Sequence, residues 1–127
     1  MATLIVCIKR NAALSRQEFL EHWQASHGPL LGRCDDFTRH LVRYTQYAPD
    51  SKDSAVSRLF GNSGDFDGVA VLEFRDAAAM ERAFSEPAYL SDVQPDEGRF
   101  VDAENCLSFV VDPLVVFRNE GPLDVDH

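Results

Sequence analysis

Two histidines and the only tryptophan of the chain lie where a predicted helix ends, in residues 21–30. His27 lies in the expected last helical turn, where the helix dipole favours a protonated imidazole. Because an imidazole changes its protonation near neutral pH, His27 is the first candidate for a general acid or base. The alternative is that His27 only caps the helix C-terminus.

His22 precedes His27 by five residues, which corresponds to about 140° around an α-helix. A helical metal pair needs a spacing of three or four residues on one face, so these two histidines do not predict a metal site. We therefore expect no metal and interpret His22 as a supporting or alternate acid/base group. Trp23 is either a core residue or a substrate contact.

A second group of candidates lies on an expected strand, residues 40–47, in which the two faces alternate. One face holds Tyr44 and Gln46 with His40 and Val42, which predicts a mixed pocket wall with Tyr44 as a catalytic group. The alternative is a half-buried strand of which one end is exposed to solvent. The opposite face is expected to hold the intervening residues: Leu41, Arg43, Thr45 and Tyr47.

Acidic residues follow Pro95 at an expected helix start, and Asp96 is the candidate among them for acid/base work. The alternative is that such acids only stabilise the helix start. Four further side chains are candidates for substrate contact: Trp23, Gln46, Phe74 and Tyr89. Three cations pair with the chain's carboxylates, or one of them binds an anionic substrate group: Lys9, Arg39 and Arg43.

The composition excludes several classes of partner. The chain has 127 residues, enough for one domain, and a formal net charge of −9, which argues against nucleic acid and against an anionic membrane surface. No apolar run approaches the ~20 residues of a transmembrane helix. Three widely spaced cysteines without a CxxC pair indicate a reduced, cytoplasmic protein. No phosphate loop, nucleophile elbow or dinucleotide fingerprint is present, so we expect a small-molecule partner and no cofactor.

The pattern of elements predicts a ferredoxin-like fold. Strands are expected at residues 3–9, 40–47, 68–74 and 105–111, and helices at 15–27, 77–84, 88–93 and 95–102. Ser15 and Glu18 form a capping box, and Gly28-Pro29 is expected to end the first helix near His27. The order β-α-β-β-α-β predicts an α+β domain over residues 1–118 with a four-stranded antiparallel sheet. A loop at 48–66 and an acidic, flexible tail at 119–127 complete the chain.

The first, third and fourth expected strands are almost continuously apolar. A sheet with one face in water alternates apolar and polar residues, so both faces of this sheet are expected to be covered. The helices cover one face. A second copy of the chain is the simplest way to cover the other sheet face, which predicts a homodimer formed through that face.

These features resemble the EthD-like family of the dimeric α+β barrel superfamily. The pieces that carry the resemblance are the opening strand into Lys9-Arg10, Leu14-Ser15 with Glu18-Phe19, His22-Trp23 with His27-Gly28-Pro29-Leu30, and Asp67-Gly68-Val69-Ala70 with Glu73-Phe74. The resemblance implies a ferredoxin-like protomer, a sheet-to-sheet dimer and a pocket between helices and sheet. It also implies that His27 matches the family's histidine after the first helix.

The resemblance implies cofactor-free dehydratases, cyclases, isomerases or monooxygenases of polyketide or aromatic metabolism. In the similar muconolactone methylisomerases, a histidine near this point and a tyrosine on the next strand line the pocket, and Tyr44 corresponds to that tyrosine. Plant-type polyketide cyclases carry His-Pro-Ala where this chain has Glu86-Pro87-Ala88. We therefore expect a lyase, cyclase or isomerase in which His27 is the general acid or base and Tyr44 or Tyr89 stabilises the developing enolate by a hydrogen bond. A haem-binding or haem-degrading protein and a non-catalytic ligand carrier or accessory subunit are the alternatives.

Overall fold

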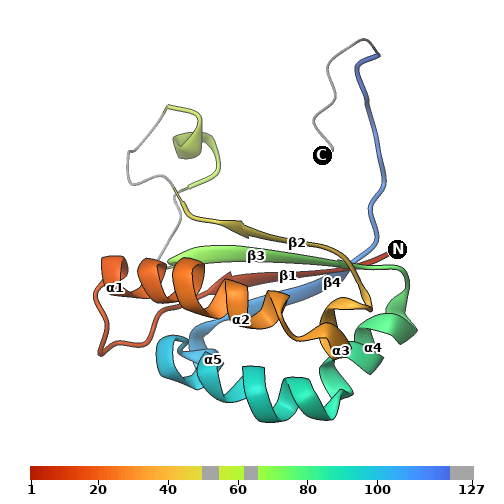
Figure 1. The fold of residues 1–127 in the computed structure, drawn as a ribbon. Coiled ribbons are helices and arrows are strands. Elements are labelled where there is room, and N and C mark those ends of the chain that lie inside the picture. The colour runs from red at the N-terminus through yellow and green to blue at the C-terminus, as the bar shows by residue number, and fades with distance from the viewer. Residues whose placement is uncertain (50–54, 62–65, 121–127) are drawn as a thin grey trace.

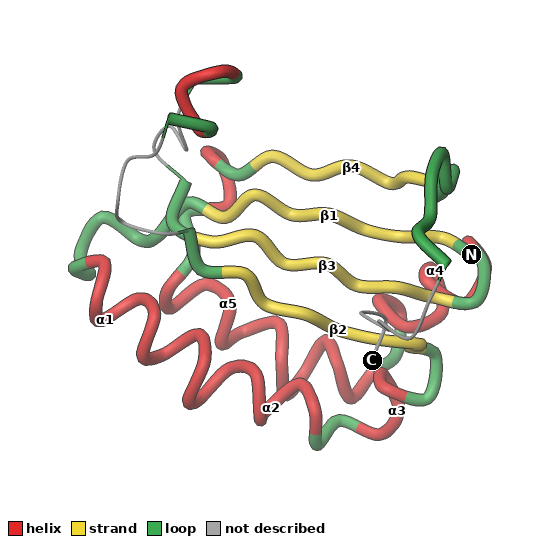
Figure 2. Tube along the Cα trace, turned by 90° about the horizontal axis from the view of Figure 1, so that it is seen from above, coloured by secondary structure: helices red, strands yellow, loops and turns green. Residues whose placement is uncertain are grey.

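Four antiparallel strands form the centre of the structure, a computed structural model that describes residues 1–49, 55–61 and 66–120. β1 (Ala2–Ile8) and β3 (Gly68–Phe74) lie inside the sheet, and β2 (Leu41–Tyr47) and β4 (Leu107–Val111) form its edges. The order β2-β3-β1-β4 is visible in Figure 2, and neighbouring strands run antiparallel. This is the predicted ferredoxin-like βαββαβ arrangement, so the fold class is confirmed.

Two helical regions cover one face of the sheet (Figure 1). The first consists of α1 (Arg16–Glu21), the π-helical turn η1 (His22–His27), α2 (Gly28–Gly32) and α3 (Asp35–Thr38). The second consists of α4 (Ala77–Ser85), the π-helical turn η3 (Tyr89–Val93) and α5 (Gln94–Phe100). Short 3₁₀ turns form η2 (Ser57–Leu59) and η4 (Ala103–Asn105). Among the described residues, no helix has the length and apolar character needed to cross a bilayer.

The predicted capping box starts α1. The backbone N–H of Glu18 donates to Ser15 Oγ at 3.1 Å, and the backbone N–H of Ser15 donates to the Glu18 carboxylate at 2.8 Å. These reciprocal bonds satisfy two donors that a helix start would otherwise leave without a partner. They fix the direction of the segment that carries both histidines.

The first helical region does not end at His27, which corrects the prediction made from Gly28-Pro29. The chain continues into α2 with Pro29 in its first turn, where a proline needs no hydrogen bond. The backbone N–H of Gly28 bonds to the carbonyl of Trp23, five residues back, and this is a π-helical bond. A π turn closes over five residues, so His22 and His27 lie on one face, contrary to the α-helical spacing.

The turn η3 repeats this arrangement. The backbone N–H of Gln94 bonds to the carbonyl of Tyr89, and Pro95 follows in the first turn of α5. In both places the wide turn precedes a proline, whose ring and missing N–H already weaken the preceding α-helical bonds. The turn η1 packs against α5, and η3 packs against α2, so each wide turn contacts the other helical region and carries residues of the site described below.

A bulge near the start of β2 changes which of its residues face the helices. Leu41 lies opposite the buried Phe74, whereas Arg43 lies opposite Glu73, so one extra residue is inserted between them. Leu41 and Val42 therefore exchange the faces that simple alternation assigns. Val42 is 55% exposed and lies with Arg43 on the side away from the helices.

The sheet face opposite the two helical regions is largely apolar, and in Figure 1 only the short turn η2 and the segment after β4 lie on that side. Ile5 of β1 lies on this face between Val71 and Phe109 of the flanking strands. Leu107 and Phe109 on this face are 53% and 50% exposed. An exposed apolar patch of this kind marks an interaction surface more often than a solvent face.

Candidate active site

A cavity of about 180 Å³ lies between the helical layer and the sheet. Its walls are mainly aliphatic and aromatic, and its polar lining residues are His27, Tyr44, Tyr89 and Glu97. Each polar group comes from a different part of the chain: η1, β2, η3 and α5. The topology therefore brings four widely separated polar side chains to one mainly apolar cavity, which is the usual composition of a small-molecule site.

Close packing of the first helical region on the sheet sets the position of η1. Gly68 at the start of β3 lies under the ring of Trp23, and a Cβ atom there would come within 2.6 Å of the ring. Trp23 is 1% exposed and stacks on Phe19 with 5.5 Å between ring centroids. The absence of a side chain at Gly68 lets Trp23 anchor the π turn directly against the sheet.

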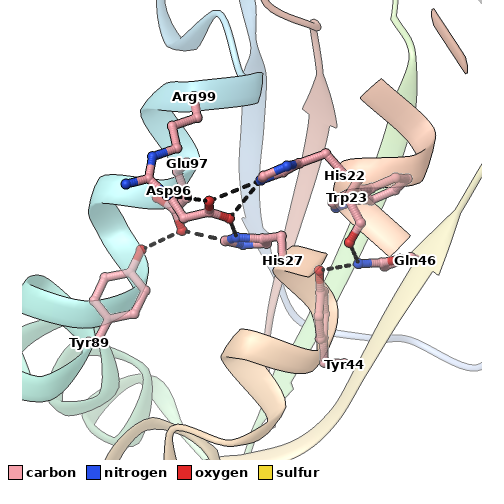
Figure 3. Close-up of polar contacts among 9 residues, drawn as sticks. All are labelled: His22, Trp23, His27, Tyr44, Gln46, Tyr89, Asp96, Glu97 and Arg99. Carbon is pink, nitrogen blue, oxygen red and sulfur yellow. Dashed lines mark hydrogen bonds and ion pairs between the residues drawn. The ribbon is translucent and has the colours of Figure 1, made fainter. Parts of the chain in front are cut away.

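The carboxylate of Asp96 lies between the two histidines of this turn (Figure 3). Asp96 Oδ2 is 2.9 Å from His27 Nδ1, and Asp96 Oδ1 is 2.9 Å from His22 Nε2. Arg99 Nη1 is a more distant partner at 3.5 Å from Oδ1. One carboxylate thus accepts hydrogen bonds from both imidazoles, an arrangement that requires the two rings to share a helix face.

Burial and charge set the protonation of this cluster. Burial lowers the pKa of His27, while the hydrogen bond and the negative charge of Asp96 oppose that effect. Burial alone would raise the pKa of Asp96, but its hydrogen bonds to His27 and His22 lower it. An ionised Asp96 accepts the Nδ1–H of a neutral His27, so the lone pair of His27 lies on Nε2, toward the cavity.

A second polar pair lies beside His27. The hydroxyl of Tyr89 donates to Glu97 Oε2 at 2.8 Å, and the same oxygen is 3.9 Å from His27 Nε2 (Figure 3). Burial, and then the charge of Asp96, raises the pKa of Glu97, against the effect of the Tyr89 hydrogen bond. Burial also raises the pKa of Tyr89 above its ordinary value, so the phenol remains protonated.

Tyr44 reaches the cavity from β2 and is held by Gln46. The side-chain amide of Gln46 donates to Tyr44 Oη at 2.9 Å and to the carbonyl of Trp23 at 3.0 Å. Burial raises the pKa of Tyr44, so its hydroxyl keeps its proton. Because the Tyr44 oxygen already accepts a hydrogen bond from Gln46, its own proton is available to an oxygen atom in the cavity.

Gly28 gives Gln46 the room for this position. A Cβ atom at Gly28 would lie 3.0 Å from Gln46 Nε2, which is tighter than an ordinary contact. Gly28, which the sequence analysis treats as part of a helix-ending signal, thus lets the Gln46 side chain pack close to the helix and hold Tyr44.

The other residues predicted for the site have varied positions. Trp23 and Tyr89 line the cavity, whereas Gln46 holds Tyr44 from outside it. Phe74 is fully buried in the core, 6.1 Å from Phe37 between ring centroids, and does not line the cavity. His22 lies behind Asp96 and has a side chain that is 30% exposed.

The cations considered for substrate binding lie elsewhere. Arg39 pairs with Glu86 at 2.8 Å, and Arg43 pairs with Glu73 at 2.6 Å on the open sheet face. No lysine or arginine of the described segments lines the cavity. In those segments, no group of three or more His, Cys, Asp or Glu side chains is arranged to hold a metal ion.

Glu97 is the residue of the site that the sequence alone did not single out as functional. It is adjacent to Asp96 in a helix start, and both acids have the same local explanation there. Only the packing of α5 against η1 separates their roles, with Asp96 between two histidines and Glu97 at the cavity. The signal available in the sequence was the tyrosine eight positions earlier, Tyr89, which donates a hydrogen bond to Glu97 in the structure.

Solved structures of low sequence identity share this fold. An EthD family protein from Bacillus halodurans C-125 has a TM-score of 0.65 at 15% identity, with 90% of this chain and 99% of that chain covered. HapK from Hahella chejuensis has a TM-score of 0.59 at 19% identity, with 95% and 100% covered. SnoaB from Streptomyces nogalater, a cofactor-independent oxygenase, has a TM-score of 0.56 at 16% identity, with 88% and 91% covered.

The sequence itself matches one family model. Among proteins with curated descriptions, none is significantly similar in sequence to this chain. The model of the EthD domain matches residues 11–104, which include both helical regions, the cavity side chains Tyr44 and Glu97, and the His22–Asp96–His27 cluster. The match spans well over half of the chain, and this protein therefore belongs to the EthD family.

Proposed function

We propose that this protein is a cofactor-independent enzyme that moves protons on a small, apolar, enolisable compound, as a lyase, cyclase or isomerase of the dehydratase type. The observation that carries the proposal is the orientation of His27. Its Nδ1 is 2.9 Å from the Asp96 carboxylate, and its ring lines a mainly apolar cavity. A carboxylate that holds one imidazole nitrogen prepares the other nitrogen to act as a general base.

Tyr44 supplies the complementary group. When a base removes a proton beside a carbonyl, negative charge develops on the carbonyl oxygen, and a fixed hydrogen-bond donor stabilises it. The Tyr44 hydroxyl lines the same cavity, stays protonated and is held by Gln46. We assign His27 the role of base, Tyr44 the role of oxyanion donor, and Asp96 with His22 the role of supporting groups.

The cavity restricts the substrate by size and charge. A cavity of about 150 Å³ takes a benzene molecule, so one of about 180 Å³ suits a single ring with small substituents. No cation lines it in the described segments, which favours a neutral compound. A haem group is several times larger than one ring, and His27 already contacts Asp96 and Glu97, so the haem alternative finds no support here.

The comparisons support chemistry without a cofactor in this fold. SnoaB is described as a cofactor-independent oxygenase, and it shares the overall fold at 16% identity. We extend from it only the general idea that this fold can act on a substrate without a cofactor. An aromatic or polyketide-type compound is the substrate class that we propose.

We also propose that the open sheet face is the surface of a homodimer. The exposed apolar side chains on it include Leu107 and Phe109, and a second copy of the same face would bury them by two-fold symmetry. Phe109→Asp should convert a dimer to a monomer in sedimentation velocity while the far-ultraviolet circular dichroism stays unchanged. A wild-type protein that sediments as a monomer at micromolar concentration would exclude this part of the proposal.

The catalytic proposal is tested by hydrogen–deuterium exchange. Cyclohexanone and acetophenone are neutral, single-ring ketones whose protons beside the carbonyl exchange in D₂O when a base removes them. The wild-type protein should accelerate this exchange, followed by proton NMR, and His27→Gln should return the rate to that of buffer. Acceleration that His27→Gln does not change would remove His27 as the base, and binding without exchange would indicate a ligand carrier.

A further inference from the structure

Glu97 lines the cavity but has no part in the roles proposed above. Its Oε2 accepts a hydrogen bond from Tyr89 at 2.8 Å and lies 3.9 Å from His27 Nε2. Figure 3 shows this oxygen between the tyrosine and the histidine, on the opposite side of His27 from Tyr44. The cavity therefore presents a base and a carboxyl group side by side.

The surroundings of Glu97 favour its protonated form. The cavity wall around it is mostly apolar, and no lysine or arginine of the described segments lines that wall. The Glu97 side chain is partly buried, with 35% of its surface exposed, and this burial and the neighbouring Asp96 charge raise its pKa against the effect of the Tyr89 hydrogen bond. A carboxyl group next to an apolar cavity is a proton donor when the neighbouring imidazole is neutral.

We propose that Glu97 is the general acid of a dehydration, and that the substrate is a neutral, single-ring β-hydroxy ketone. This inference rests on the proposed role of His27 as base and adds the group that makes the reaction a loss of water. The cavity volume of about 180 Å³ limits the substrate to about one ring. A base beside a protonated carboxyl group fits the loss of a hydroxyl group, which leaves as water only when it receives a proton.

The proposed reaction balances without any further reactant. His27 Nε2 takes the proton from the carbon beside the ketone, and Tyr44 donates a hydrogen bond to the ketone oxygen. The electron pair of that C–H bond becomes the new carbon–carbon double bond as the neighbouring C–O bond breaks. Glu97 gives its proton to the departing hydroxyl, which leaves as water.

The site then returns to its starting state. After the reaction His27 is an imidazolium and Glu97 a carboxylate, with 3.9 Å between Nε2 and Oε2 in the structure. Transfer of one proton from His27 to Glu97, directly or through the released water, restores both groups. The net products are an unsaturated ketone and water.

The probe for this inference is 3-hydroxycyclohexanone, which forms cyclohex-2-enone and water. The wild-type enzyme should accelerate this reaction, followed by the ultraviolet absorbance of the conjugated ketone. Glu97→Gln keeps an acceptor for Tyr89 but has no acidic proton, so it should slow dehydration on the order of 10²-fold or more. Glu97→Asp retains a carboxyl group and should keep part of the activity. The matched control is Glu104→Gln, an exposed charge removal on η4, which should leave the rate unchanged.

Exchange and dehydration measured on the same variants separate the two proposals. Glu97→Gln should slow dehydration far more than cyclohexanone exchange, whereas His27→Gln should slow both together. Equal losses in Glu97→Gln, or no dehydration by a wild-type enzyme that catalyses exchange, would overturn the inference and leave the role of His27 intact. A wild-type enzyme that catalyses neither reaction would overturn the proposed function itself. Thermal unfolding of each variant checks that loss of activity is not loss of fold.

Discussion

The two sides of Asp96 hold the same type of residue in opposite situations. On the cavity side, His27 meets Asp96 through Nδ1 and has a side chain that is 7% exposed. On the outer side, His22 meets it through Nε2 and has a side chain that is 30% exposed. The π turn places both rings on one carboxylate, but the strand and helix packing gives only one of them access to the cavity. Both histidines contact the same acid, so this contact does not distinguish the candidate catalytic residue. What distinguishes His27 is that its second ring nitrogen points toward the cavity.

The largest expected effect comes from changing one histidine and then the other. His27→Gln should slow ketone exchange on the order of 10²–10⁴-fold, because it removes the general base. His22→Gln removes only a partly exposed partner of Asp96, worth about 0.2–1 kcal/mol, so it should slow exchange about fivefold or less. Similar losses in the two variants, measured by the same NMR assay, would contradict the comparison.

Tyr44→Phe should give the next largest loss. It removes the hydrogen-bond donor proposed for the developing oxyanion and should slow exchange on the order of 10²-fold. Gln46 would lose its acceptor on Tyr44 but keep the Trp23 carbonyl, so the fold should be retained. A loss in ketone binding with an unchanged maximal rate would show that Tyr44 binds the substrate without stabilising the transition state.

Asp96→Asn should have a smaller effect on rate and a clear effect on pH dependence. The rate of exchange should rise with pH as His27 loses its proton, with an apparent pKa below the ordinary value near 6.5, because burial lowers the pKa of His27. Asp96 raises that pKa, so its neutral replacement should move the rise to lower pH. A rise that moves to higher pH in Asp96→Asn would contradict the proposed coupling.

The smallest effect concerns stability. Because the folded state lowers the pKa of His27, the unfolded chain binds its proton more readily, and stability should fall as pH drops below about 6.5. Asp96 has a lowered pKa too, and its contribution should be lost at more acidic pH, below about 3.9. Urea unfolding at pH 7.5 and 5.5 should show this fall in the wild type and a reduced fall in His27→Gln. An equal fall in both proteins would assign the effect to other groups.

Local signals in the sequence were enough for the fold. The capping box of Ser15 and Glu18 and the apolar strands each depend on neighbours in the chain, and the structure confirms them. The ferredoxin-like order follows from those elements. The two corrections, at Pro29 and at Leu41, both involve one additional residue in a turn or a strand, which periodicity alone cannot register.

The site was predictable only in part for the same reason. His27 and Tyr44 could be selected from residue chemistry, and the structure places both on one cavity. The contact of His22 with Asp96 could not be predicted, because an α-helical spacing sends His22 to another face. The distinct position of Glu97 depends on contacts between α5 and η1. These segments are far apart in the sequence, and His27 and Asp96, which form a hydrogen bond, are separated by 69 residues.

The most direct test of the account is the tautomer of each histidine, read from long-range ¹H–¹⁵N NMR spectra of the protein at neutral pH. We predict opposite tautomers on the two sides of Asp96. Neutral His27 should carry its proton on Nδ1 and leave Nε2 free for the cavity, and the neutral form of His22 should carry its proton on Nε2. A proton on Nε2 of His27 in its neutral form, or an imidazolium at His27 at neutral pH, would contradict its assignment as the base.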